Sequence, residues 1–156
     1  MSTSPPLDST DKALLRLLQR DASLTNKELA YKLNKSPATI HERVRRLKDQ
    51  GYITRIVAIV DRRKIDKTLI AISHVLLKEH TAKTLGEFER SIAQFEEVME
   101  CYQMTGSFDF ILKIATSNME EYHLFLRHKL AVLPNIVTVQ SFFILSETKN
   151  DTAYPV

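Results

Sequence analysis

Residues 25–51 read TNKELAYKLNKSPATIHERVRRLKDQG. Thr25-Asn26-Lys27-Glu28 has the Thr-x-x-Glu spacing of a capping box, in which the hydroxyl and the carboxylate each accept a free backbone N–H at a helix start. Ser36-Pro37 begins a second helix with serine at the N-cap and proline in the first turn. Gly51 would supply the left-handed residue that ends this helix. Two short helices joined by a tight turn predict a helix-turn-helix.

The second of these helices has an apolar side and a basic side. Ile40, Val44 and Leu47 recur at i, i+4 and i+7, so this stripe is expected to face a core. The opposite side is polar and cationic, which is typical of a helix that reads DNA. The residues predicted to meet DNA are Ser36, Ala38, Thr39, His41, Glu42, Arg45 and Arg46.

Arginine can take the O6 and N7 edge of guanine in bidentate fashion, so Arg45 and Arg46 are expected to face outward and contact bases or phosphates. Two alternatives stay open. The basic residues could form only a solvated helix face, or these two arginines could make surface ion pairs with Glu42 or Asp49. Ser36 is first a helix cap, which is compatible with a phosphate contact from the same hydroxyl.

Composition and charge favour a globular protein with two unlike halves. The chain has 156 residues, of which 44% are hydrophobic and 26% charged, and its formal net charge is +3. Residues 1–64 hold 14 Lys/Arg and 7 Asp/Glu, a net of +7, whereas residues 65–156 hold 8 and 12, a net of −4. The basic half is expected to meet phosphate and the acidic half to avoid it.

Nothing in the sequence indicates a membrane or an exported protein. No apolar run approaches the roughly 18 residues that span a bilayer, and the N-terminal residues lack the basic and apolar regions of a signal peptide. A single cysteine, Cys101, cannot form an internal disulfide, so a reducing cytoplasm is expected. Cys101 itself is expected to be a small core residue.

The front half is predicted to be a three-helix domain over residues 7–60. Its first helix is expected to be capped by Asp8 or Ser9, and the apolar, β-branched run Tyr52–Val60 to form a strand or a wing. Residues 61–67 are charged and lack an apolar period, so they are expected to be a linker. A second domain follows over residues 68–148.

In this second domain strand and helix patterns alternate as β-α-β-β-α-β. That order predicts a ferredoxin-like domain, an antiparallel sheet with both helices on one face, and so an α+β protein. The other face would carry apolar side chains such as Ile70, Ile72, Phe142 and Ile144. An uncovered apolar face normally finds a partner, so we expect a dimer packed sheet to sheet. The expected elements are strands at 69–78, 98–105, 108–116 and 136–146, a turn at 106–107, and helices capped at Thr81 or Thr84 and at residues 117–120.

The chain resembles the Lrp/AsnC family, the leucine-responsive or feast/famine transcription regulators. The resemblance runs from Leu7 to about Lys149. It rests on Leu7-Asp8-x-x-Asp11, on Asn26-Lys27-Glu28-Leu29-Ala30, on Arg43-Val44-Arg45-Arg46-Leu47 with Gly51-x-Ile53, and above all on the segment ECYQMTGSFDF at residues 100–110.

The resemblance implies a regulator that binds double-stranded DNA as a dimer, often assembled into octamers, with a small effector, usually an amino acid, bound near the Gly106 turn. Carried over to matching positions, the effector-binding residues would be Thr105, Gly106, Ser107 and Asp109. Many family members have an acidic residue where Ser107 stands. From the residues alone, Asp109 could equally be a buried carboxylate that caps the turn.

No residue pattern indicates catalysis, a metal or a cofactor. The five histidines show no metal-ligand spacing, and there is no glycine-rich phosphate loop and no paired-carboxylate signature. Two other functions remain open. Small decarboxylases that act on an iron tetrapyrrole resemble this chain in architecture. A broad architectural DNA-binding protein would use the same front domain without a tight sequence preference.

Overall fold

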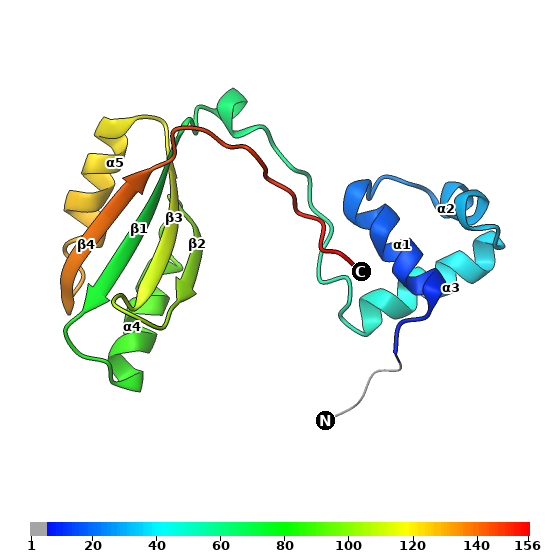
Figure 1. Cartoon of the computed structure of the whole chain (residues 1–156), viewed down its shortest axis with the longest axis horizontal. Coiled ribbons are helices and arrows are strands. Elements are labelled where there is room, and N and C mark those ends of the chain that lie inside the picture. The colour runs from blue at the N-terminus through cyan, green and yellow to red at the C-terminus, as the bar shows by residue number, and fades with distance from the viewer. Residues whose placement is uncertain (1–5) are drawn as a thin grey trace. The chain divides into compact units, whose positions relative to one another are not determined.

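The computed structural model describes residues 6–156 and divides them into two compact units. The first contains the residues up to Ile59 together with Lys149–Val156, and the second contains Val60–Thr148. In the first unit lie three helices, α1 (Ser9–Arg20), α2 (Asn26–Leu33) and α3 (Pro37–Asp49) (Figure 1). The predicted three-helix domain with a helix-turn-helix is therefore confirmed.

Each of these helices starts at the cap that its sequence predicts. Asp8 caps α1 in a capping box with Asp11, and Thr25 caps α2 in a capping box with Glu28. Ser36 caps α3, with Pro37 in the first turn, and Gly51 follows the helix with a left-handed φ of 75°. Each of these caps acts within about one helical turn. Short-range interactions therefore set where the three helices begin and where α3 ends.

One residue stripe of each helix forms the core of the first unit. Leu14 of α1, Leu29 of α2, and Ile40 and Leu47 of α3 are all but fully buried. Val44 is half-buried against the same cluster, so the predicted i, i+4, i+7 stripe of α3 does face the core. Burial of one side of α3 leaves its other side available to a partner.

The strand predicted within Tyr52–Val60 is wrong for this structure. The segment has no strand, and Ile56, Ile59 and Val60 are more than half exposed. A strand needs a neighbour that takes up its backbone hydrogen bonds, and none of the described residues pairs with this run as a strand. Its β-branched composition alone was therefore not sufficient to form one.

The C-terminal residues Lys149–Val156 belong to the first unit and pack on its helices. The backbone N–H of Tyr154 donates to Gln19 Oε1 at 2.7 Å, and Gln19 Nε2 donates back to the Tyr154 carbonyl at 3.1 Å. Val156 packs against the helical core, and Arg16 Nε donates to its carbonyl oxygen at 2.5 Å. The polar tail predicted from Glu147 onward thus includes residues that dock on α1.

The second unit is a four-stranded antiparallel sheet with two helices. Its strands lie in the order β2-β3-β1-β4, and a 3₁₀ turn at Arg62–Ile65 precedes β1. This order confirms the predicted ferredoxin-like domain. The elements are β1 (Leu69–Leu77), α4 (Ala82–Ile92), β2 (Val98–Gln103), β3 (Phe110–Thr116), α5 (Met119–Phe125) with a π-helical continuation (Leu126–Leu130), and β4 (Ile136–Phe143).

Both helices cover the same face of this sheet (Figure 1). Phe88 of α4 packs against Phe110 of β3 with the rings tilted and their centroids 4.6 Å apart, and Phe125 of α5 belongs to the same core. The opposite face carries no helix. There Ile72 lies opposite Phe142 in register, and Phe142 is 48% exposed. Of the four residues predicted on this face, Phe142 and Ile144 are exposed, Ile72 is half-buried and Ile70 is buried.

Candidate functional site

The outer side of α3 presents a polar and cationic surface. Of the seven residues predicted to meet DNA, all but Arg46 are exposed. The N-terminus of α3 is ordered by its cap: the Thr39 N–H donates to Ser36 Oγ at 3.1 Å, and the two hydroxyl oxygens lie 2.8 Å apart. His41 Nδ1 lies 3.2 Å from Asn26 Nδ2, which links α3 to α2. These contacts hold the first turn of α3 in a fixed orientation.

Arg45 makes an ion pair that solvent weakens. Its Nη2 lies 3.0 Å from Glu42 Oε1, and the two side chains are 63% and 64% exposed. Exposed pairs of this kind contribute about 0–1 kcal/mol, so little opposes the transfer of the Arg45 guanidinium to a nearby phosphate or base. The outward position predicted for Arg45 is confirmed, and so is the alternative contact with Glu42.

Arg46 does not lie free on this surface. Its Nη2 donates to both carboxylate oxygens of Asp11, at 2.8 and 2.7 Å, and the Asp11 side chain is only 3% exposed. Arg43 Nη1 donates to the same Asp11 at 2.8 Å and to Asp8 at 2.6 Å. We call these four residues the α1–α3 ion cluster. The Arg46 side chain is 41% exposed, but a buried carboxylate on α1 holds its guanidinium, so Arg46 differs from Arg45 and its contact with DNA stays a prediction.

Within the α1–α3 ion cluster, hydrogen bonds stabilise the charged forms of Asp8 and Arg43. The Asp11 backbone N–H, followed by the Arg43 guanidinium, lowers the pKa of Asp8 to about 2. Hydrogen bonds from Arg43 to Asp8 and then to Asp11 raise the pKa of Arg43. The spacing Leu7-Asp8-x-x-Asp11 gave the signal for the cap of α1, but nothing in it indicated that Asp11 reaches residues 32 and 35 positions further along the chain.

The predicted effector residues lie at the turn between β2 and β3. Thr105, Gly106 and Ser107 are exposed, and Gly106 has a φ of 118°, which a residue with a side chain rarely adopts. Asp109 differs from them. Its side chain is 17% exposed, its Oδ2 accepts the Leu77 N–H at 2.7 Å, and its Oδ1 lies 2.9 Å from His80 Nε2.

Asp109 thus already has partners from β1 and from the segment that follows it. Its backbone is also engaged, since the Asp109 N–H donates to the Val75 carbonyl and its own carbonyl accepts from Met104. This is the geometry of the turn-capping alternative. No motif in the sequence pointed to His80, which is brought to Asp109 only by the pairing of β1 with β3.

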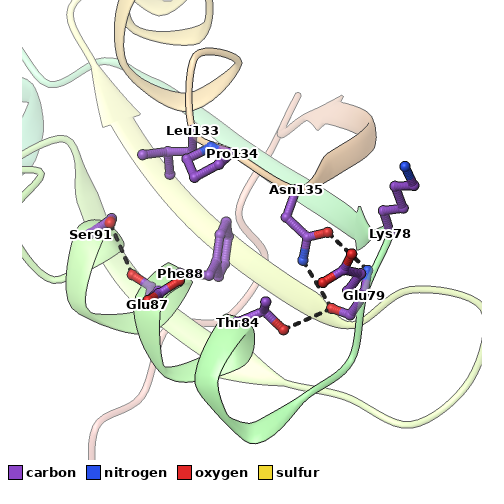
Figure 2. Close-up of a pocket in the computed structure, with 9 residues that line it drawn as sticks. All are labelled: Lys78, Glu79, Thr84, Glu87, Phe88, Ser91, Leu133, Pro134 and Asn135. Carbon is purple, nitrogen blue, oxygen red and sulfur yellow. Dashed lines mark hydrogen bonds between the residues drawn. The ribbon is translucent and has the colours of Figure 1, made fainter.

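A pocket of about 350 Å³ lies elsewhere in the second unit, between the end of β1, α4 and the α5–β4 connection (Figure 2). Phe88, Leu133 and Pro134 supply its apolar wall. Asn135 closes one side through two hydrogen bonds of 2.9 Å with the backbone of Glu79. None of the predicted effector residues lines it, and no motif in the sequence pointed to it.

Cys101 lies exposed on β2 and not in the core, so that expectation is wrong. Partial desolvation, with a smaller contribution from the Glu89 carboxylate, raises the pKa of Cys101 to about 11. The thiol is therefore protonated at neutral pH, which disfavours a nucleophile. Among the described residues no three His, Cys, Asp or Glu side chains group as a metal site, and no helix there is long and apolar enough to cross a bilayer.

Comparisons with known proteins agree with these features. Residues 7–54 match the family model described as winged helix-turn-helix DNA-binding, and residues 70–154 match the Lrp/AsnC ligand binding domain. The chain is 36% identical to the transcriptional regulator AzlB of Bacillus subtilis over 96% of both proteins. It is 30% identical to the leucine-responsive regulatory protein of Escherichia coli K12, over 92% of this chain and 87% of that protein.

A solved structure gives the same result in three dimensions. The transcriptional regulator of Neisseria meningitidis in complex with L-Met superimposes with a TM-score of 0.92 at 28% identity, over 96% of this chain and 97% of that one. The structural match covers both the helix-turn-helix and the ferredoxin-like domain. The two relatives are transcriptional regulators, and this chain aligns with most of the length of each. This chain therefore belongs to the Lrp/AsnC family of DNA-binding transcriptional regulators.

Proposed function

We propose that this chain regulates transcription by placing α3 in the major groove of duplex DNA, as a dimer whose DNA binding responds to an amino acid. The observation that carries the proposal is the surface of α3: its apolar stripe is buried in the domain core, while Arg45, Glu42 and Thr39 project from the other side. The proposed role is non-enzymatic. The proposed location is the cytoplasm, which follows from the proposed DNA partner.

The proposed DNA contacts follow from the exposure of each side chain. Arg45 is the leading candidate for a guanine edge or a phosphate, because its pair with Glu42 is exposed and weak. Thr39 and His41 are candidates for bases or backbone, and Ser36 for a phosphate at the N-terminus of α3. Ala38 is small enough for the helix to approach the base edges closely. Two such helices in a dimer would read half-sites about 34–36 Å apart.

Binding to selected and to scrambled duplexes tests this part of the proposal. We expect random-sequence selection to enrich one roughly palindromic site, and affinity for it to fall steeply with salt because phosphate contacts release counterions. Arg45→Gln should weaken binding and make the salt slope shallower by about 0.9 if the contact is to phosphate. Arg127→Gln, an exposed arginine in the second unit, is the matched control. Failure to enrich any sequence would refute sequence-specific binding.

The uncovered face of the sheet supports a dimer. Phe142 and Ile144 are 48% and 41% exposed there, beside the half-buried Ile72. An apolar sheet face of this kind gains stability when a second copy covers it. The family resemblance extends the proposal to octamers built from such dimers.

Sedimentation of single-charge variants tests the dimer. Phe142→Glu would bury a carboxylate in the proposed interface, so we expect the variant to sediment as a monomer at concentrations where the parent is a dimer or larger. Leu124→Glu on α5 is a matched control, because Leu124 is 49% exposed and lies on the helical side of the sheet. Equal assembly of both variants with the parent would refute dimerisation through this face.

An amino acid is the proposed effector, and the turn at Thr105, Gly106 and Ser107 is its proposed border. Two observations support it: the exposure of this turn, and the L-Met bound in the complex of the Neisseria meningitidis regulator. Asp109 is a supporting residue in this proposal, since its carboxylate caps β1.

A thermal-shift screen of the twenty amino acids tests the effector. A true ligand at 100 times its Kd stabilises the folded protein by about 2.7 kcal/mol. The double variant Thr105→Ala/Ser107→Ala should lose most of that shift, whereas Ser146→Ala, an exposed serine outside the turn, should keep it. A shift of the same size in the double variant would remove this turn from the site.

A further inference from the structure

The α1–α3 ion cluster brings two arginines of the reading helix to carboxylates of α1. It contains two carboxylates, Asp8 and Asp11, and two guanidinium groups, Arg43 and Arg46, so its formal charge is zero. Between Ser36 and Gln50, α3 carries only four Arg and Lys side chains, and the cluster holds two of them. The α3 cations outside the cluster are Arg45 and Lys48, which are exposed.

Burial makes the contact between Asp11 and Arg46 hard to exchange. The Asp11 side chain is 3% exposed and accepts from both arginines at 2.7–2.8 Å, whereas Glu42, the partner of Arg45, is 64% exposed. If a phosphate drew Arg46 away, a buried carboxylate would lose one of its two cations without gaining water. If a phosphate drew Arg45 away, Glu42 would simply be solvated.

We propose that Asp11 is a specificity-determining residue that withholds Arg46, and with it Arg43, from DNA phosphates and so limits sequence-independent affinity. Attraction by phosphates supplies nearly all non-specific DNA binding. A helix that offers fewer free cations therefore depends more on the side chains that read bases. The inference rests on the proposed contact between α3 and duplex DNA.

The isosteric variant Asp11→Asn tests the inference. Its amide oxygen can still accept the Asp8 N–H that closes the cap of α1, but its charge is gone and both arginines are released. We expect tighter binding to scrambled duplex at low salt, with a salt slope steeper by about 0.9 for each arginine that reaches a phosphate. If Arg46 alone reaches a phosphate, the affinity of Asp11→Asn should fall roughly 3–4-fold further than that of the parent between 50 and 200 mM salt. If Asp11 served only the folding of the domain, its replacement would not raise the affinity for DNA.

Arg46→Gln supplies the second measurement. In the parent background it should leave the salt slope unchanged, because Arg46 is already neutralised, whereas Arg45→Gln should make the slope shallower. In the Asp11→Asn background Arg46→Gln should cancel about 0.9 of the gained slope. Circular dichroism shows whether Asp11→Asn folds. If it does not, the salt slopes of Arg46→Gln and Arg45→Gln in the parent background test the inference.

Two results would overturn the inference while leaving the proposed function intact. One is an unchanged or shallower slope for a folded Asp11→Asn. The other is a loss of slope in Arg46→Gln as large as in Arg45→Gln, which would mean that Asp11 presents Arg46 to the phosphate and does not withhold it. A parent protein that binds no duplex at any salt concentration would refute the proposed function, and the inference with it.

Discussion

Replacement of Asp109 by alanine should destabilise the second unit, and the contacts of the carboxylate set the expected loss in the free energy of unfolding. The carboxylate accepts the N–H of Leu77, a residue only 2% exposed, at 2.7 Å, and pairs with His80 at 2.9 Å. A buried donor left without an acceptor costs about 1–3 kcal/mol. For a domain of the size of residues 60–148, about 2 kcal/mol corresponds to a fall in Tm of roughly 8–16 °C.

Asp109→Asn separates the hydrogen bond from the charge. The amide oxygen can still accept from Leu77, so we expect this variant to lose about 1 kcal/mol less stability than the alanine variant. Urea unfolding followed by far-UV circular dichroism measures both values. Glu147→Ala is the control, because Glu147 is exposed and makes no hydrogen bond or ion pair with the described residues.

Equal stability of the parent and Asp109→Ala would refute the capping role and return Asp109 to the effector-binding residues. Equal losses in the alanine and asparagine variants would show that the charge, and not the acceptor, is what β1 requires. If the capping role holds, the loss of an effector response in an Asp109 variant would reflect a disordered turn and would not identify a ligand contact.

Three further predictions concern the caps, the core and acid stability. Thr25→Ala removes the hydroxyl that accepts the Glu28 N–H, so urea unfolding should show a loss of about 1 kcal/mol. Phe110→Ala empties a fully buried position on β3 and should cost about 3–5 kcal/mol in the same measurement. The Ser117 hydroxyl and N–H, followed by Lys67, lower the pKa of Glu121 from 4.5 to about 2. Glu121 therefore stabilises the fold above pH 4.5 and loses this effect as the pH falls toward 2. Free energies of unfolding measured from pH 6 to pH 2 should fall less steeply for Glu121→Gln than for the parent.

The parts of this fold that the sequence predicted are those set by neighbouring residues. The caps at Thr25 and Ser36 and the stop at Gly51 act within one helical turn, so their residue types are sufficient to locate α2 and α3. The βαββαβ order was equally readable, because each strand and helix has its own apolar period. At the candidate site, the exposure of Arg45 also followed from the 100° step of a helix.

The errors arise where a residue's environment is supplied by a distant segment. Tyr52–Val60 has strand composition, but no described strand pairs with it. The edge position of β2 exposes Cys101, which composition alone would place in a core. His80 and Asp109 come together only through the pairing of β1 with β3. In each case the environment of the residue depends on which distant segment packs against it, and the local sequence does not encode that contact.

The α1–α3 ion cluster shows why this matters for function as well as for fold. A helical projection of α3 treats Arg45 and Arg46 as equivalent neighbours on one cationic side. The fold separates them, because α1 crosses α3 where Asp11 reaches Arg46 and leaves Arg45 with only a solvated partner. The electrostatic field of α3 at a DNA phosphate therefore depends on which arginines lie within reach of a buried carboxylate. A count of basic residues on the reading helix overestimates the number of free cations until the packing of α1 is known.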